Sequence, residues 1–154
     1  QRQMCIRDRF TSYNTATQVP LIIYDPLTNT KGTTNALVSL VDVFPTLVEL
    51  CKLEPPKNQL DGESLVGIFN NLDSKGKEHV FIKRKNGFTL KTRQYSYTEF
   101  INAKNNKTID KMLYDHRSNK TENRNVAEKE EFGKIVLELS NILHSKFKEN
   151  IQGK

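Results

Sequence analysis

A short continuous run of apolar residues, VPLIIY at positions 19–24, is the first clear pattern along the chain. It lacks polar alternation and ends at Asp25 and Pro26, which favour a turn. Runs of this kind are typical of strands buried on both faces of a parallel or mixed sheet. We therefore predict a buried strand here. Such a strand needs neighbours on both sides, and the other strand candidates form a separate hairpin cluster, so we expect the chain to be part of a larger protein.

After a polar loop, the apolar spacing becomes that of a helix, which we predict from Asp42 to about residue 53. Asp42 is a suitable N-cap, and Pro45 falls in the first turn, where its missing N–H removes no intrahelical bond. One face of this helix is apolar, so Cys51 is expected to be a small core residue. The apolar positions are Val43, Phe44, Leu47, Val48 and Cys51. A turn at 60–65 then leads to a short helix that ends near Asn70.

From residue 78 onward, the pattern has a period of two. The segments 79–85 and 88–100 flank Asn86 and Gly87, a dipeptide that is the strongest short signal for a two-residue hairpin turn. A third strand is predicted at 111–115, after a polar loop. These segments predict a small antiparallel sheet.

A final helix is predicted from Asn125, with Glu128 three residues later as a variant of the capping box. Its apolar side chains form one stripe, so the helix should pack on the hairpin sheet. The stripe consists of Phe132, Ile135, Val136, Leu139, Ile142, Leu143 and Phe147.

The formal net charge of the 154-residue chain is +6, and the positive charge is concentrated between residues 74 and 94. The cations of that window are Lys75, Lys77, Lys83, Arg84, Lys85, Lys91 and Arg93, and they oppose only Glu78. A basic surface attracts polyanions such as nucleic acid or sulfated glycan. The simpler interpretation is a solvated hairpin. No stretch approaches the ~20 apolar residues of a membrane span.

The residues that could bind a metal ion are few and scattered. The three histidines and two cysteines have no zinc-ligand spacing. Asp115 and His116 are adjacent and could suggest a metal site, but a structural role of Asp115 in a turn is the favoured interpretation.

Several motifs resemble elements of sulfatases of the alkaline-phosphatase-like superfamily. VDVFPT at 41–46, followed by LDGESL at 60–65, looks like the segment after the active-site core of these enzymes. The stretch at 13–25 is similar to their Asn/Asp-x-Ala-Thr-x-Val-Pro-Leu strand. Three further segments resemble the elements that close the sulfatase chain at its carboxy-terminal end. They are KTRQYSYTEF at 91–100, LYD at 113–115 and ENRNVA at 122–127. The compact length and the Tyr-rich hairpin favour an iduronate-2-sulfatase-like relative.

The resemblance implies an α/β fold of the alkaline-phosphatase-like type, of which this chain holds a fragment. Residues 10–73 would end the catalytic core and supply the last part of its sheet. Residues 74–154 would form a carboxy-terminal α+β subdomain, with a small antiparallel sheet packed on a long helix. Residues 1–9 have no strand or helix periodicity and are interpreted as foreign sequence.

Cys5 and Arg9 have the spacing of the sulfatase activation motif, in which a cysteine becomes formylglycine. Arg7 stands where that motif requires Pro or Ala, so we assign no catalytic role to Cys5. Lys91 also departs from the family, which usually has Arg at this place, and lysine cannot reproduce the guanidinium fork.

The resemblance implies a hydrolase of sulfate esters that uses a formylglycine nucleophile and a calcium ion. In the family's order these groups all lie amino-terminal to Phe10, so this fragment is expected to be inactive alone and to hold no catalytic or metal-binding residue. The implied partners are a sulfated glycan or other sulfate ester, and a formylglycine-generating enzyme for the full-length protein; no nucleic acid is expected. The implied location is periplasmic or secreted.

Four residues of the basic hairpin are predicted to contact substrate, namely Lys91, Arg93, Tyr95 and Tyr97. A polyanionic sugar would meet cations for its charges and aromatic rings for its ring faces. In the alternative, the tyrosines pack under the carboxy-terminal helix and the cations are solvated.

A second hypothesis is that the chain is a self-contained basic α+β module that binds anionic glycan or nucleic acid without catalysis. The two hypotheses differ in what they expect upstream of Phe10. The sulfatase requires an open frame with Cys or Ser, x, Pro or Ala, x, Arg and paired aspartates, whereas the module requires a start site near Met4.

Overall fold

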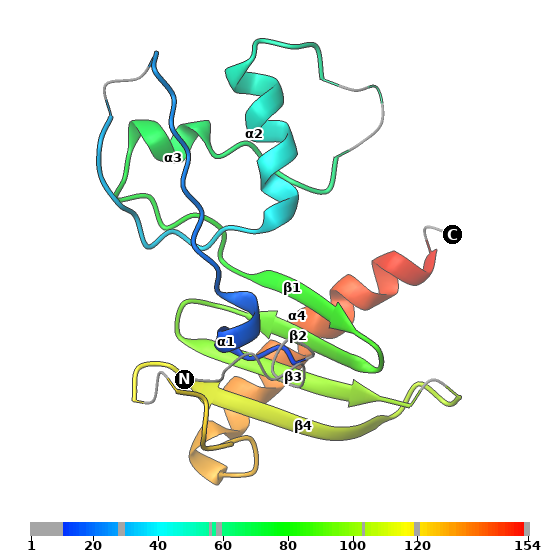
Figure 1. Cartoon of the computed structure of the whole chain (residues 1–154). Helices are drawn as coiled ribbons and strands as arrows, with labels where there is room; N and C mark the ends of the chain where they lie inside the picture. Colours follow the sequence, from blue (N-terminus) through cyan, green and yellow to red (C-terminus); the bar gives the residue numbers. More distant parts are fainter. Residues whose placement is uncertain are drawn as a thin grey trace. The chain divides into compact units, whose positions relative to one another are not determined.

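The computed structural model describes residues 11–27, 30–55, 57, 60–102, 104–118 and 121–152, with side chains described up to residue 146. The interpretation of residues 1–9 as foreign lies outside the described residues. The chain divides into two compact units (Figure 1). We call Leu21–Val80 the helical unit, and the described residues before Leu21 and after Val80 the sheet unit.

The helical unit contains a 3-10 turn, η2 (Leu40–Asp42), and two helices, α2 (Val43–Leu50) and α3 (Val66–Asn70). Pro45 lies in the first turn of α2, and α3 ends where the sequence predicted. Asp42 ends η2 and occupies the N-cap position of α2, as predicted, but its side chain makes no cap hydrogen bond to that helix. Its carboxylate instead binds other parts of the unit.

Asp42 is fully buried and ties three segments together. Its carboxylate accepts hydrogen bonds from the N–H of Ser39 at 2.8 Å and of Glu63 at 2.9 Å, and pairs with Lys77 Nζ at 2.6 Å. Burial opposes the charged form of Asp42, but these contacts outweigh it and hold its pKa below the usual range. The carboxylate therefore fixes the turn at 60–65 against the start of α2.

Thr46 supports the same junction one turn further along α2. It is fully buried; its hydroxyl donates to the Asp42 carbonyl and accepts a hydrogen bond from the N–H of Leu65 at 2.9 Å. Gly62 lies against this junction, where an added Cβ would overlap the Val41 carbonyl oxygen. The motifs at 41–46 and 60–65 are thus packed on each other.

Three burial predictions for the amino-terminal half are wrong. Residues 19–24 form no strand, and Ile22 and Tyr24 are 89% and 86% exposed. Cys51 is exposed rather than a core residue, and Phe44 and Leu47 on its helical face are about half exposed. The helical periodicity is present, but no layer among the described residues covers this face.

The sheet unit contains four strands in the order β1-β2-β3-β4. They are β1 (Val80–Arg84), β2 (Gly87–Lys91), β3 (Tyr95–Ile101) and β4 (Thr108–Asp115). The β2–β3 and β3–β4 pairs are antiparallel, with Leu90 opposite Tyr97 and Tyr97 opposite Leu113. The predicted third strand is confirmed and begins three residues earlier than expected.

The predicted strand at 88–100 is wrong, because it is two strands joined by a tight turn. The Thr92 hydroxyl accepts hydrogen bonds from the N–H of Gln94 and of Tyr95, so a threonine side chain organises the reversal. The first hairpin turn also shifts by one residue: Lys85 and Asn86 form it, with Lys85 in the left-handed region at φ 48°, while Gly87 opens β2.

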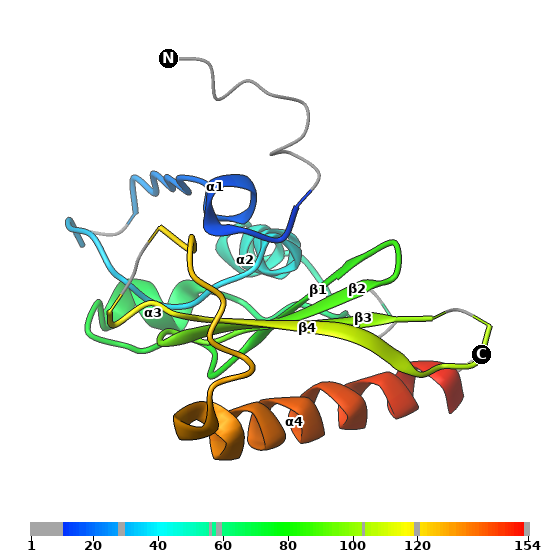
Figure 2. The ribbon, with the colours of Figure 1, turned by 90° about the horizontal axis from the view of Figure 1, so that it is seen from below.

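One face of the sheet is covered by α4 (Gly133–Gln152), which follows the 3-10 turn η3 (Glu130–Phe132). Figure 2 shows α4 along this face, which we call the helix face, while α1 (Asn14–Thr17) lies on the other, the α1 face. The predicted packing of helix on sheet is confirmed. The buried core consists of Leu90, Tyr95, Tyr97, Leu113, Val126, Ala127, Val136, Leu139 and Leu143.

The predicted helix start at Asn125 is wrong, because helical structure begins at Glu130. The Asn125 side chain is used elsewhere. Its Oδ1 accepts from the N–H of Leu113 at 2.9 Å and of Ala127 at 3.0 Å, and its Nδ2 donates to the Lys111 carbonyl. Asn125 therefore fastens the connection before α4 to β4.

We predict that Gly62→Ala destabilises the helical unit. The new methyl group would overlap backbone atoms of Val41 and lie 2.9 Å from the Asp42 nitrogen, so the junction must shift. Overpacking of this kind costs about 1–3 kcal/mol of unfolding free energy.

Denaturant unfolding of Gly62→Ala provides the measurement, with Gly67→Ala as the matched control. Gly67 lies in α3 with open space around its Cβ position, so that change should be neutral or stabilise by ~0.5–1 kcal/mol. Equal stability of the two variants would contradict the close approach.

Candidate functional site

The α1 face of the sheet unit gathers polar groups around Glu122. This residue is 7% exposed and has φ 51°, a left-handed conformation that a glutamate rarely adopts. Its carboxylate accepts hydrogen bonds from the N–H of Asn14 and from His116 Nε2 at 2.9 Å, and lies 3.6 Å from Lys91 Nζ. We call Asn14, Lys91, His116 and Glu122 the Glu122 cluster.

Lys91 is held by the same cluster. It is the last residue of β2 and lies opposite Ser96, and its ammonium group donates to Asn14 Oδ1 at 2.6 Å. Only 7% of Lys91 is exposed. Burial lowers its pKa, although the Glu122 charge acts in the opposite direction. The pKa of Glu122 is also lowered: burial opposes its charge, but the His116 and Asn14 hydrogen bonds and the Lys91 charge outweigh burial.

Next to the cluster, two tyrosines and a methionine form an aromatic wall on the same face. The rings of Tyr13 and Tyr114 meet edge to face, with centroids 5.6 Å apart. Both hydroxyls approach the Met112 sulfur, at 4.0 Å and 3.4 Å. This wall anchors the segment before α1 to β4.

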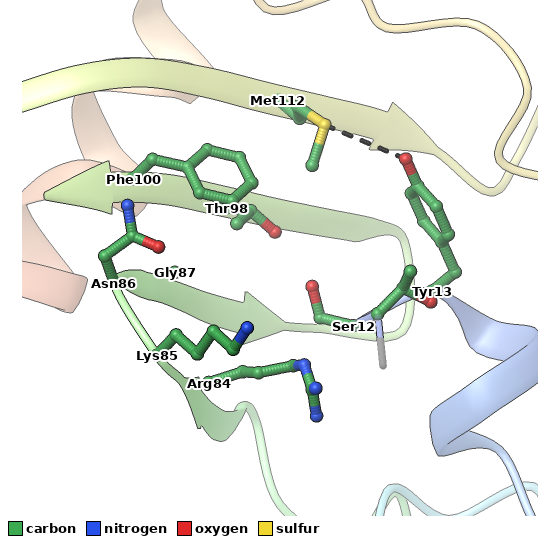
Figure 3. Close-up of a pocket in the computed structure, with 10 residues that line it drawn as sticks. Ser12, Tyr13, Arg84, Lys85, Asn86, Gly87, Thr98, Phe100 and Met112 are labelled. Atoms are coloured by element: carbon green, nitrogen blue, oxygen red, sulfur yellow. Dashed lines mark hydrogen bonds between the residues drawn. The ribbon is translucent and has the colours of Figure 1, made fainter. Parts of the chain in front are cut away.

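A pocket of about 180 Å³ opens beside this wall, at the turn between β1 and β2 (Figure 3). We call it the turn pocket. Its polar lining comes from the end of β1, the turn, β3 and the segment before α1, and its apolar lining includes Phe100 of β3 and Met112 of β4. The residues include Ser12, Arg84, Lys85, Asn86, Thr98 and Phe100.

The four residues predicted to contact substrate are not brought to one surface. Lys91 lies on the α1 face within the Glu122 cluster, and Arg93 is exposed in the turn between β2 and β3. Tyr95 and Tyr97 lie in the core under α4. Substrate contact by these residues stays a prediction, and the packing alternative describes the position of both tyrosines.

Tyr97 belongs to a second buried network, on the helix face. Its hydroxyl donates to Glu99 Oε1 at 2.6 Å; burial, followed by the Glu99 contact, raises the pKa of Tyr97. Glu99 is 2% exposed and also accepts from Ser140, Thr108 and His144. This carboxylate therefore fastens α4 to the sheet.

Tyr95 has a different partner, because the Arg117 guanidinium lies 4.8 Å from the centre of its ring. Arg117 also binds Asp115 through Nε and Nη2, and its N–H donates to Asp115 Oδ1 at 3.0 Å. The predicted turn role of Asp115 is confirmed. Among the described residues, no group of three or more His, Cys, Asp or Glu could hold a metal ion.

Sequence reasoning missed the Glu122 and Glu99 networks. Glu122 was visible as the first residue of the ENRNVA motif, but nothing in the spacing indicated that Asn14 and His116 would meet it. Glu99 sits at a strand position whose alternation gives only its face. A glutamate on the apolar face of a strand was the available signal.

Comparison with known proteins agrees with this architecture. Residues 5–149 match the family described as N-sulphoglucosamine sulphohydrolase, C-terminal. The chain belongs to this family. The predicted sulfatase resemblance is thereby confirmed at the level of the sulfatases; the iduronate-type subdivision stays a prediction.

Relatives extend well beyond this chain. Arylsulfatase K of Gallus gallus is 25% identical, over 89% of this chain and 27% of its own length. A protein solved in complex with its substrate D-glucosamine-2-N,6-O-disulfate matches at 20% identity and TM-score 0.64, over 75% of this chain and 25% of that one. A phosphonate monoester hydrolase of Agrobacterium radiobacter matches at 21% identity and TM-score 0.58, over 74% and 25%. The predicted fold class is confirmed, and the chain spans about a quarter of the length of these proteins.

We predict that Glu122→Gln destabilises the sheet unit, because it leaves Lys91 buried without its charge partner. The expected loss of unfolding free energy near neutral pH is on the order of 3 kcal/mol. The folded-state pKa of Glu122 is depressed, so its contribution is present above its usual pKa of about 4.5 and is lost as pH falls through the lower folded value. The stability difference between wild type and variant should therefore shrink in acid.

Denaturant unfolding between neutral pH and pH 3 checks this, with Glu131→Gln as the control. Glu131 is exposed and pairs with exposed Lys129, so its removal should change stability by less than about 0.5 kcal/mol at every pH. A Glu122→Gln effect as small as the control's would show that the cluster contributes nothing.

Proposed function

We propose that this chain is the carboxy-terminal portion of a sulfatase that hydrolyses sulfate esters of a sulfated glycan. The observation that carries the proposal is the match of residues 5–149 to the carboxy-terminal family of N-sulphoglucosamine sulphohydrolase. The sulfated glucosamine bound by one fold neighbour supports a sulfated sugar as the substrate class. This portion alone is proposed to be inactive.

The catalytic groups are proposed to lie outside this chain. Formylglycine would supply the nucleophile, and calcium would supply charge stabilisation at the sulfate. The described residues do not fit a calcium site held by carboxylates, since they contain no group of three or more His, Cys, Asp or Glu that could hold a metal ion. No step of the reaction is therefore assigned to a metal in this chain.

The sheet unit would then act as a rigid support beside the active site. Two of its buried carboxylates, those of Glu99 and Glu122, hold α4 on one face and the segment around α1 on the other. Of the four predicted substrate contacts, Arg93 is exposed and would be the one to contact substrate directly. Lys91 would act by positioning Asn14, whose segment leads into the core of the enzyme.

Three finer features complete the proposal. The proposed relationship to iduronate-2-sulfatase-like enzymes rests on the compact length and the Tyr-rich hairpin. A formylglycine-generating enzyme is the proposed partner of the full-length protein, and the periplasm or the exterior is the proposed location. Within the described residues, no helix has both the length and the apolar character to cross a membrane.

The alternative function is a non-catalytic basic module that binds anionic glycan or nucleic acid. The observation that favours it is the concentration of cations between residues 74 and 94, in a chain of net charge +6. The binding-module alternative does not account for the family match, whereas the sulfatase proposal explains that match directly.

The test is to sequence the source DNA upstream of Phe10 and to assay the completed protein after formylglycine formation. We expect hydrolysis of a sulfated glucosamine, reduced by ~10³-fold or more when the nucleophile of the activation motif is changed to Ala. An intact short gene that starts near Met4 would refute the sulfatase proposal and leave the binding module.

A further inference from the structure

The turn pocket carries a chemistry that the proposed function does not assign. Arg84 and Lys85 line it from the β1–β2 turn, and none of its ten lining residues is acidic. The Lys85 amine is not paired with a carboxylate in the part of the chain that the structure describes. The pocket is therefore a concave cationic surface.

The turn that carries these cations is fixed by the strands beside it. Lys85 adopts φ 48°, and the N–H of Ile101 donates to the Asn86 carbonyl at 2.7 Å. An added Cβ at Gly87 would lie 3.2 Å from the Phe100 ring, so the turn packs tightly on β3. Figure 3 shows the Lys85 side chain extending across the pocket towards Ser12.

The other lining groups suit a sugar more than a bare ion. Hydroxyls of Ser12 and Thr98 and the amide of Asn86 are neutral hydrogen-bonding groups, and Phe100 supplies an apolar surface. The volume of about 180 Å³ is below the roughly 300–1,000 Å³ of pockets for drug-sized ligands. It suits one anionic group together with part of a single sugar ring.

Other cations of the basic segment between residues 74 and 94 do not line the turn pocket. Lys83 Nζ lies 5.5 Å from the centre of the Phe88 ring, and Lys91 is buried in the Glu122 cluster. Lys77 pairs with Asp42. Only Arg84 and Lys85 of this window line the pocket, so the pocket differs from a diffuse basic surface.

We propose that the turn pocket is a subsite for one sulfate or carboxylate group of a sulfated sugar. Arg84 and Lys85 would place two positive charges beside the anion, and Ser12 would donate a hydrogen bond. The subsite deepens the proposed function and rests on it for the biological ligand, although its binding chemistry can be tested without turnover.

The experiment titrates the 154-residue chain at low salt with D-glucosamine-2-N,6-O-disulfate, with unsulfated glucosamine as the comparison, followed by NMR or calorimetry. The double variant Arg84→Gln/Lys85→Gln should weaken binding of the sulfated sugar about tenfold or more. Lys104→Gln/Arg124→Gln removes the same two charges from exposed positions outside the pocket and should change binding less than about twofold.

A third variant separates the pocket from the overall charge. Ser12→Leu fills the pocket without altering any charge and should also abolish binding, with thermal unfolding confirming that the chain stays folded. The proposal is overturned if both double variants weaken binding equally, if Ser12→Leu binds as the wild type does, or if unsulfated glucosamine binds equally well. Tighter binding of a single-stranded oligonucleotide than of the sulfated sugar would also overturn it.

Failure of the subsite and failure of the sulfatase proposal give different results. An active completed enzyme whose KM for a polysulfated substrate is unchanged by Arg84→Gln/Lys85→Gln would overturn the subsite alone. Selective binding of the sulfated sugar by a protein that lacks sulfatase activity would overturn the sulfatase proposal alone.

Discussion

Three buried carboxylates determine how the described segments of this chain are joined. Asp42, Glu99 and Glu122 are 0%, 2% and 7% exposed, and an unpaired carboxylate at such positions would cost far more than the protein's net stability. Each can be charged only where donors surround it, and the donors come from segments far apart in the sequence. Asp42 draws together the start of α2, the turn at 60–65 and Lys77; Glu99 draws β4 and α4 to β3; Glu122 draws Asn14 to the end of β4. Among the described residues, every buried side-chain nitrogen or oxygen has a hydrogen-bond partner.

This constraint explains what the sulfatase-like motifs do in the molecule. VDVFPT and LDGESL meet through Asp42, Thr46 and the close approach at Gly62. ENRNVA supplies Glu122 to the α1 face and Asn125 to the edge of β4. These contacts are structural, because they join segments that lie apart in the sequence. Of the residues that line the turn pocket, Ser12, Arg84 and Lys85 lie outside the sulfatase-like motifs, whereas Tyr13, Thr98 and Phe100 belong to them.

Periodicity predicted the sheet unit well, because that unit contains its own cover. Alternation located β1, β4 and the stretch that holds β2 and β3, and the apolar stripe of α4 meets the face that carries Leu90, Tyr97 and Leu113. The errors arose where a side chain replaced a backbone signal. Thr92 makes a turn without Gly, Pro or Asn, and Asn125 bonds to β4 instead of capping a helix. Networks such as the Glu122 cluster could not be predicted, because their members lie far apart in the sequence and meet only in the folded chain.

The helical unit shows why a correct period does not guarantee burial. Phe44 and Leu47 lie on one face of α2, as their spacing requires, yet about half of each remains exposed, and Ile22 and Tyr24 are almost fully so. Burial of apolar surface under a covering layer stabilises a protein by roughly 25 cal/mol for each Å² removed from water, and this surface lacks that stabilisation. A stripe and a strand-like run left open together are the expected surface of a unit that completes a larger core. Under the proposed function, that larger core is the remainder of the sulfatase.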